Sequence, residues 1–324
     1  MSLLEVNGLK KYFPVRTGLL GRLAGRRPAW LKAVDGVDMS IREGETLGLV
    51  GESGSGKSTL GRTIVGLYEA TAGEVFFAGR HVERQTARER KQYRQEAQMI
   101  FQNPYSSLNP RKTVRQILDV PLRIRQVPAN DRLEQMEELL ALVGLNRWHL
   151  HQYPHQFSGG QRQRIGIARA LAMSPKFIVA DEPVSALDVS IQAQIINLLK
   201  DLQAQFHLTY LFIAHDINVV HHVSNRIAVM YLGRVVEMAG RDDLLFHSRH
   251  PYTKALISAI PEISKSQRRE RILLEGAIPS PLSPPPGCCF QTRCPQKKGP
   301  VCGEIVPRLK DIGGNHLVAC HHFT

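Results

Sequence analysis

A run of glycine, serine and lysine near the N-terminus has the spacing of a phosphate-binding loop. The stretch Gly51-Glu-Ser-Gly-Ser-Gly-Lys-Ser-Thr59 follows a short apolar run and precedes an apolar pattern of helical spacing. Glycines let backbone N–H groups converge on phosphate oxygens, and the N-terminus of a following helix adds positive potential. Lys57 would reach the β and γ phosphates, and the Ser58 hydroxyl would bind Mg²⁺. The expected nucleotide contacts are Gly51, Ser53, Gly54, Ser55, Gly56, Lys57, Ser58 and Thr59.

A pair of adjacent carboxylates follows a second apolar run. Phe177-Ile-Val-Ala180 leads directly into Asp181 and Glu182, and Asp181 lies 124 positions after Lys57. One acid at a strand end can be a helix cap, but two adjacent acids suit two different tasks. Asp181 would hold the Mg²⁺ shell through water, and Glu182 would be the general base for the attacking water. The two motifs together indicate a P-loop NTPase.

A glycine-rich stretch between these motifs narrows the class. Ser158, in Phe157-Ser-Gly-Gly-Gln161, lies 23 positions before Asp181 and precedes helix-compatible residues. Ser158 and the amides of Gly159 and Gly160 would open a helix and so form a second anion site. The stretch resembles the signature sequence of the ATP-binding-cassette (ABC) ATPases, with phenylalanine where leucine is commoner.

Three further motifs carry the same resemblance. Gln102 resembles the Q-loop glutamine, Ser185-Ala-Leu-Asp188 the D-loop, and His215 the switch histidine. In that family two cassettes pack head to tail, and each ATP lies between the phosphate loop of one and the signature of the other. The resemblance therefore implies that hydrolysis requires a dimer and that His215 contacts the γ-phosphate and positions water.

The resemblance also assigns the remaining site residues. An aromatic residue before the phosphate loop stacks on adenine in this family, which here would be Phe13 or, as the alternative, Tyr12. Either ring could instead belong to the core, and residues 15–31 form a basic, glycine-rich insertion after them. The expected catalytic residues are Lys57, Gln102, Glu182 and His215. The expected Mg²⁺ ligands are Ser58, Gln102 and Asp181, and the remaining nucleotide contacts are Ser158, Gly159, Gly160, Gln161 and Asp188.

Two segments resemble the ATPase subunits of oligopeptide and dipeptide importers. Asn103-Pro-Tyr-Ser-Ser-Leu-Asn-Pro110 resembles their loop that meets the permease, and His250-Pro-Tyr-Thr253-Lys-Ala-Leu256 resembles part of their C-terminal extension. The resemblance implies a peripheral protein on the cytoplasmic face of the inner membrane that hydrolyses ATP. Its partners would be a related second ATPase, two membrane permeases and an extracytoplasmic peptide-binding protein. Nickel and other small-solute importers share the extension, so import of such a solute is one alternative. A soluble cassette ATPase that acts on nucleic acid is the alternative from another functional class, but we expect no nucleic-acid partner.

All five cysteines fall within the last 37 residues. Disulfides are disfavoured in a reducing cytosol, so clustered cysteines indicate a metal site or inert burial. The spacing of Cys288, Cys294, Cys302 and Cys320 lacks the C-x₂-C pairs of a zinc ribbon. Four thiolates suit a [4Fe–4S] cluster, and the resemblance to importer tails favours the same cofactor. Zinc and no metal remain the alternatives, and Cys289 is the expected spare, with an exchange of roles between Cys288 and Cys289 as the alternative.

The elements that must position these residues alternate between strand and helix. Short apolar runs at 46–50, 177–180 and 211–214 are typical of strands buried on both faces of a parallel sheet. Helical spacing at 191–203 and 133–143 predicts two helices, the first with Ile191, Ile195, Leu198, Leu199 and Leu202 on one face. The expected fold is α/β, a P-loop NTPase cassette with a mostly parallel sheet, and the resemblance adds an N-terminal antiparallel β part.

The chain divides into segments of different composition. We expect an ABC ATPase domain over 1–260, with a helical subdomain at about 103–165, and a small C-terminal extension over 261–324. Residues 279–286 read as a linker because they are rich in proline, which lacks an amide donor. Basic and polar residues at 261–271 indicate an exposed connection.

The composition excludes several classes of protein. With 43% hydrophobic and 22% charged residues, the chain is that of a folded protein and not of a disordered one. It lacks a run of about 18 apolar residues, so no membrane-spanning helix is expected, and Lys10 and Lys11 argue against a secretory signal. The net charge of +13 suits phosphate and an anionic membrane surface as well as nucleic acid.

Overall fold

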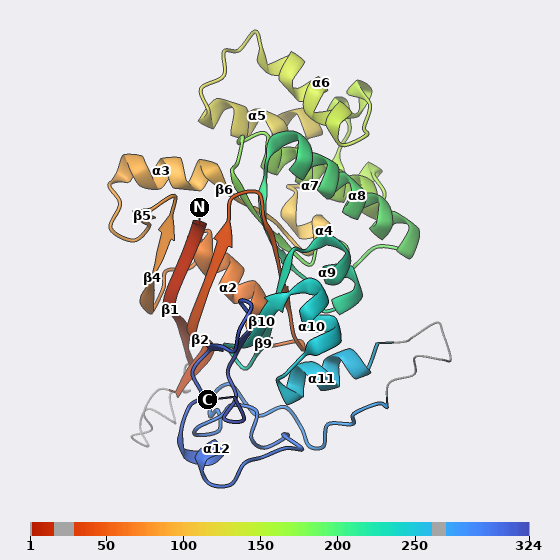
Figure 1. Ribbon diagram of the computed structural model, residues 1–324. Coiled ribbons are helices and arrows are strands. Elements are labelled where there is room, and N and C mark those ends of the chain that lie inside the picture. The colour runs from red at the N-terminus through yellow and green to blue at the C-terminus, as the bar shows by residue number, and fades with distance from the viewer. Residues whose placement is uncertain (1, 16–28, 261–269, 324) are drawn as a thin grey trace, which may run out of the picture. The chain divides into compact units, whose positions relative to one another are not determined.

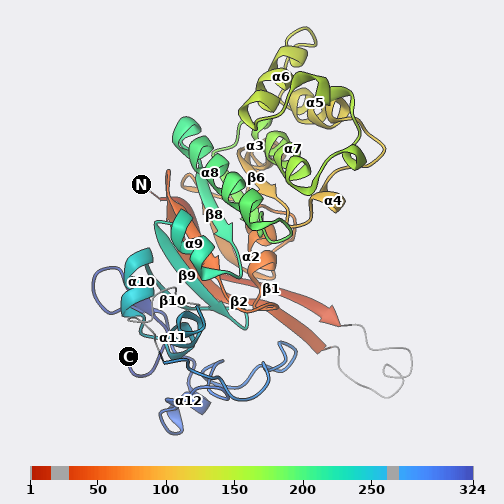
Figure 2. The same cartoon turned by 90° about the vertical axis from the view of Figure 1, so that its right-hand side faces the viewer.

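The computed structural model describes residues 2–15, 29–260 and 270–323 (Figures 1 and 2). The described residues form two compact units. Unit 1 contains residues 41–46 and 82–213 together with residues 2 and 3. Unit 2 contains the described residues of 4–40, 47–81 and 214–323. Most of the insertion expected at 15–31 and of the connection expected at 261–271 therefore lies outside the described residues.

Unit 1 is built on three parallel strands that are buried along their length. They are β6 (Ala97–Ile100), β7 (Phe177–Asp181) and β8 (Thr209–Ile213). β7 lies in the middle, with Phe177 opposite Ala97 on one side and opposite Thr209 on the other. Parallel strands need helical crossovers, which cover both faces and explain why these runs are apolar throughout. The two buried strands predicted in this unit are confirmed.

The structure assigns helices and turns but no strand to residues 103–156 of unit 1, and the helix predicted at 133–143 is confirmed as α6 (Arg132–Leu142). α5 begins with a capping box, in which Thr113 accepts from the amide of Gln116 and Gln116 accepts from that of Thr113. Figure 1 shows α5, α6 and α7 gathered together. The helices of the unit are α3 (Ala87–Glu96), α4 (Pro104–Ser107), α5 (Val114–Ile124), α6 (Arg132–Leu142), η1 (Arg147–His151), η2 (Pro154–Gln156), α7 (Gly159–Leu171) and α8 (Val189–Phe206).

The face that α8 buries differs in part from the predicted one. Ile195, Leu199 and Leu202 are buried as expected, but Ile191 and Leu198 are only half-buried, and Ile196 is buried instead. The apolar stripe is therefore rotated slightly toward Ile196. The predicted helical spacing itself is confirmed, and the helix extends beyond the expected range at both ends.

Unit 2 contains an antiparallel sheet and a second set of strands. The antiparallel sheet has the order β2-β1-β4-β5, which confirms the expected N-terminal β part. In the second set, β3 runs parallel to β9, and β9 forms an antiparallel hairpin with β10. The elements are β1 (Ser2–Val15), β2 (Ala29–Arg42), β3 (Thr46–Val50), α2 (Lys57–Ile64), β4 (Ala72–Phe77), β5 (Arg80–His81), α9 (Ile217–Val223), β9 (Arg226–Tyr231), β10 (Arg234–Gly240), α10 (Arg241–His247) and α11 (Pro251–Ser258).

The C-terminal tail extends the sheet of unit 2. β12 (Leu317–Val318) pairs antiparallel with β10, and β11 (Lys310–Asp311) pairs with β12. The tail also contains the short helix α12 (Val301–Glu304). In Figures 1 and 2 the ribbon of the tail passes beside α11. Residues 279–286 form neither helix nor strand. The tail is thus joined to the sheet by backbone hydrogen bonds as well as by side chains.

A buried carboxylate fastens the tail to β10. Glu237 is fully buried, and its carboxylate accepts hydrogen bonds from the backbone N–H of Arg249 at 2.6 Å and of His250 at 3.0 Å. The ring Nε2 of His316, which lies just before β12, is 2.7 Å from the same carboxylate. One side chain therefore connects the sheet, the start of α11 and the tail.

Candidate functional site

The phosphate loop lies between β3 and α2 in unit 2, with its lysine folded into the loop. Lys57 is only 5% exposed, and its Nζ donates to the backbone oxygens of Gly51 at 2.8 Å and Glu52 at 3.0 Å. α2 begins at Lys57, and Gly56 is its N-cap. A buried ammonium held by carbonyl dipoles places a positive charge beside the N–H groups that open a helix. This arrangement suits a bound phosphate group.

Two glycines of the loop are required by packing as well as by backbone conformation. Gly56 has φ +103°, and a Cβ there would lie 2.0 Å from the carbonyl oxygen of Ala33 on β2. Gly51 has φ +155°, and its Cβ would lie 2.2 Å from the oxygen of Met230 on β9. No side chain fits at either position without movement of the backbone. The loop is therefore pressed against strands that the sequence motif does not include.

The predicted acids of unit 1 stand at the end of β7. Asp181 is fully buried, and Glu182 directly after it has a left-handed backbone with φ +46°. A non-glycine residue in this region costs about 1–3 kcal/mol and persists only where its surroundings fix it. Here the Glu182 amide donates to the Ile213 oxygen at 2.9 Å, and Ser185 Oγ donates to the Glu182 oxygen at 3.2 Å.

The structure brings two of the predicted catalytic residues together. The side-chain amide of Gln102, which follows β6, donates from Nε2 to Glu182 Oε2 at 2.9 Å. The two residues are 80 positions apart and meet because β6 and β7 are parallel neighbours. The carboxyl ends of parallel strands reach the same edge of a sheet, where ligands of open α/β folds bind. Lys57, in contrast, belongs to unit 2.

The signature segment caps α7. Ser158 is the N-cap residue, its side chain accepts from the Gln161 amide, and Gln161 accepts from the Ser158 amide at 3.0 Å. A Cβ on Gly160 would lie 2.6 Å from Cγ2 of Ile191 on α8, whereas one on Gly159 would lie 3.3 Å from Leu187 Cδ2. The helix N-terminus is thus held close to the segment that contains Asp188, which is the N-cap residue of α8.

Comparisons with known proteins identify the family. The ABC transporter family model matches residues 34–185, and the model of the oligopeptide/dipeptide transporter C-terminal region matches residues 236–302. Over 100% of its length the chain is 52% identical to the oligopeptide transport ATP-binding protein AppF of Bacillus subtilis, of which it covers 98%. This chain belongs to the ABC transporter family. The resemblance carried by the motifs is confirmed.

Other relatives and solved structures agree with this assignment. The ABC chain is 49% identical to the dipeptide transport ATP-binding protein DppF of Escherichia coli, over 98% of this chain and 93% of the relative. A dimeric structure of the ATP-binding cassette MJ0796 bound to ADP and phosphate matches it with a TM-score of 0.63 and 30% identity. That match covers 74% of this chain and 98% of the other. The cassette fold predicted from the sequence is confirmed.

The predicted switch histidine, His215, is solvent-exposed. His215 comes directly after the buried Ala214, which follows β8, and the next residue, Asp216, caps α9 by accepting from the Asn218 amide at 2.8 Å. The cap fixes the backbone immediately after the histidine. His215 is therefore held at a strand end with its imidazole open to solvent.

The two candidate adenine-stacking rings have different surroundings in this cassette. The hydroxyl of Tyr12 donates to Asp35, which also pairs with Arg234 at 2.6 Å, and desolvation together with the Asp35 carboxylate raises the pKa of Tyr12 to about 12. Phe13 makes an edge contact with Tyr68 at 5.4 Å between centroids. Both rings are half-buried, so each keeps part of its surface open to a ligand.

Four of the five tail cysteines influence one another. Burial raises the pKa of Cys288 to about 11, and the thiols of Cys302, Cys320 and Cys294 add to this effect. The backbone amide of Lys298 donates to the sulfur of Cys302 at 3.3 Å. All five cysteines are free thiols. Within the described residues, however, no group of three or more His, Cys, Asp or Glu side chains is arranged to hold a metal ion.

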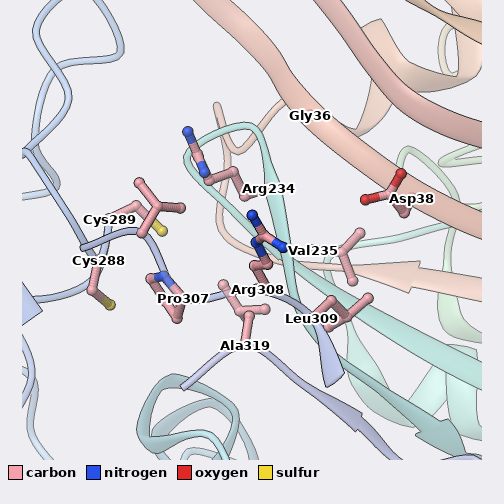
Figure 3. Close-up of a pocket in the computed structure, with 12 residues that line it drawn as sticks. Gly36, Asp38, Arg234, Val235, Cys288, Cys289, Pro307, Arg308, Leu309 and Ala319 are labelled. Carbon is pink, nitrogen blue, oxygen red and sulfur yellow. The ribbon is translucent and has the colours of Figure 1, made fainter. Parts of the chain in front are cut away.

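Cys289, the predicted spare cysteine, is buried beside the β9–β10 hairpin, and the neighbouring thiol of Cys288 contributes to the pKa shift of its own thiol. Its sulfur lies 3.9 Å from the backbone oxygen of Tyr231, and burial raises its pKa to about 12. Figure 3 shows Cys288 and Cys289 beside a cavity of about 320 Å³ that is also lined by Arg234 and Val235 of β10. The tail segment that begins at the cysteine pair therefore lies against the β9–β10 hairpin.

Proposed function

We propose that this chain is the ATP-hydrolysing subunit of an ABC importer for dipeptides or oligopeptides. The observation that carries the proposal is identity near 50% over both the cassette and the tail with proteins named as oligopeptide and dipeptide transport ATP-binding proteins. A shared cassette alone would support only ATP binding. The additional match to the oligopeptide/dipeptide transporter C-terminal region supports the solute class.

In this proposal the phosphate loop binds the phosphates of ATP. Lys57 contacts the β and γ phosphates, and Ser58, Gln102 and Asp181 hold Mg²⁺. The metal ion, when bound, neutralises charge on the phosphate oxygens. Phe13 stacks on adenine, with Tyr12 as the alternative. The buried lysine and the packed glycines support the phosphate contacts, because they form an anion site that needs little rearrangement on binding.

Glu182 accepts the proton of the attacking water. Its hydrogen bond with Gln102 supports this role, because the amide fixes the orientation of the carboxylate at the end of β7. His215 contacts the γ-phosphate. A second cassette supplies Ser158, Gly159, Gly160 and Gln161 to the same ATP, with Asp188 at the interface, so hydrolysis requires a dimer.

The importer would contain this chain, a related second ATPase, two membrane permeases and an extracytoplasmic peptide-binding protein. Among the residues that the structure describes, no helix is long and apolar enough to cross a membrane. We place the chain at the cytoplasmic face of the inner membrane, where its net charge of +13 suits anionic lipids. ATP would favour the closed dimer and so shift the permeases between their two states.

Two substitutions test the ATPase. Glu182→Gln removes the base but preserves the size and shape of the side chain. We therefore expect MgATP binding to persist while turnover falls by about 100-fold or more, as for loss of a general base. Lys57→Ala should weaken MgATP binding itself, and Ser190→Ala, at an exposed position of α8, is the control. Wild-type turnover in the Glu182→Gln protein would refute its role as base.

The solute class requires a separate test. A pulldown of the tagged chain from membranes, followed by mass spectrometry, should recover two permeases and a peptide-binding protein. Recovery of permeases for nickel or another small solute would replace the peptide assignment and leave the ATPase intact. A wholly soluble complex with salt-sensitive DNA binding would refute the transporter assignment.

We further propose that Cys288, Cys294, Cys302 and Cys320 hold a [4Fe–4S] cluster. Four thiols that affect one another supply the donor set of such a cluster. Backbone hydrogen bonds to the sulfurs, such as the one from Lys298 to Cys302, favour thiolates. The described thiols do not form a closed site, so binding would require them to turn toward a common centre.

Metal analysis of protein purified without oxygen tests this assignment. The wild-type protein should contain iron and sulfide and absorb broadly in the visible range. Cys294→Ser should lower the iron content, and Cys289→Ser, which changes the spare thiol, should not. Colourless protein with stoichiometric zinc, or with no metal, would refute the cluster.

A further inference from the structure

The phosphate loop is joined to the C-terminal tail by an ion pair. Arg293, in the tail, donates from Nη1 to Glu52 Oε2 at 2.9 Å and from Nη2 to Glu52 Oε1 at 3.4 Å. Glu52 is the second residue of the loop, and the two residues lie 241 positions apart in the sequence. Two parallel bonds between a guanidinium and a carboxylate fix orientation as well as distance.

The backbone of Glu52 is held equally firmly. Its N–H donates to the hydroxyl of Tyr252 on α11 at 3.0 Å, and its carbonyl oxygen accepts from Lys57 Nζ at 3.0 Å and from the Ser55 amide at 3.1 Å. Every polar group of this residue therefore has a partner. Two of the partners, Tyr252 and Arg293, lie outside the phosphate-loop motif.

Arg293 is itself fixed by an aromatic cluster. Its side chain is only 8% exposed, and its backbone N–H donates to the Phe290 oxygen at 3.0 Å. Phe290 is fully buried and contacts the rings of Tyr231 and Tyr252 with centroids 5.2 and 5.4 Å away. Water is thus largely excluded from the guanidinium, which strengthens its attraction to Glu52.

Glu52 poses an electrostatic problem for a loop that binds phosphate. A carboxylate on such a loop repels the negative charge of a nucleotide, whereas a paired carboxylate is close to neutral overall. Within unit 2, the cation that the structure places against this carboxylate is Arg293. Lys57 Nζ donates to the backbone oxygen of Glu52 at 3.0 Å.

We propose that Arg293 is a positioning residue for the nucleotide site: it neutralises Glu52 and, together with Tyr252, holds the phosphate loop in its binding conformation. The proposal rests on the ATP-binding function proposed above. Because the pair acts on the loop and not on the attacking water, its loss should raise the KM for ATP and leave kcat nearly unchanged.

Binding of MgATP to the full-length protein, with steady-state ATPase kinetics, tests this role. Arg293→Met should weaken MgATP binding about tenfold, which is the effect of 1.4 kcal/mol, and should raise KM with kcat within about twofold. Arg293→Lys keeps the charge and should recover most of the affinity. Arg308→Met is the matched control, because Arg308 is an exposed tail arginine that lines the cavity of Figure 3.

A double substitution separates the charge effect from a folding defect. Glu52→Gln combined with Arg293→Met removes both charges, so affinity should return to within about threefold of wild type if repulsion causes the loss. Unchanged affinity in Arg293→Met, or a double variant as weak as the single one, would overturn the proposal. If the wild-type protein itself neither binds nor hydrolyses ATP, the proposed function fails instead.

Discussion

Glu237 offers a quantitative test of how the tail is attached. Glu237→Gln preserves the shape of the side chain but replaces one acceptor oxygen by an NH₂ group. If the amide oxygen takes the place of Oε1, it keeps the bonds from Arg249 and His316, and the NH₂ group then faces the buried N–H of His250. An unpaired buried donor costs about 1–3 kcal/mol, and loss of charge weakens the other two bonds by about 1 kcal/mol each.

The expected loss is therefore about 3–5 kcal/mol for the attachment of the tail. Hydrogen exchange at the Ala319 amide, which donates to the Val236 oxygen at 2.9 Å, reports this attachment directly. Its protection should fall by about 100-fold or more in the Glu237→Gln protein, because exchange follows the free energy of local opening. Glu304→Gln, at an exposed position of the tail, is the control. A protection factor for Ala319 within about threefold of the wild-type value would refute this account of the buried carboxylate.

Three further features can be tested by substitution. Burial lowers the pKa of His250 from 6.5 to about 4, so between these pH values the unfolded chain binds a proton that the folded chain does not. As the pH falls from 6.5 toward 4, this difference lowers the free energy of unfolding by up to about 3 kcal/mol. His250→Asn, which retains a cap acceptor, should reduce this pH dependence of thermal unfolding, and an unchanged slope would contradict the assignment. Gly160→Ala should destabilise the protein by about 1–3 kcal/mol, whereas Gly166→Ala in the same helix, with no atom within 4 Å of the added Cβ, should stabilise it slightly in the same melting experiment. Gly56→Ala should abolish MgATP binding in a titration, and Gly54→Ala, strained but with open space, should only weaken it; equal affinities would show that the contact with Ala33 is unimportant.

The buried strands could be predicted from the sequence because their local hydrophobic pattern is distinctive. Buried parallel strands are apolar throughout, so the runs at 46–50, 177–180 and 211–214 could be recognised without knowledge of their neighbours. Gln102 and Glu182 lie close together because the parallel strands β6 and β7 end at one edge of the sheet, but only the strand before Glu182 was predicted from the sequence.

The attachments of the tail could not be predicted in the same way. β11 and β12 contain two residues each, too few to show any periodicity. The partners of Glu52 lie 200 and 241 positions away, and no local pattern connects them. The steric requirement for glycine at position 56 could not be predicted either. The motif accounts for Gly56 by the approach of phosphate, whereas the structure shows that a Cβ there would also collide with the backbone oxygen of Ala33.

The contact between Glu52 and Arg293 also sets an order of events during synthesis. A ribosome that adds about 5–20 residues per second needs roughly 12–50 s to travel from the codon for Glu52 to that for Arg293. During that interval the nascent chain already contains its complete phosphate-loop motif, yet the guanidinium that neutralises the loop does not exist. A chain released early, before the tail has emerged, would therefore leave the ribosome as a poor competitor for cellular ATP.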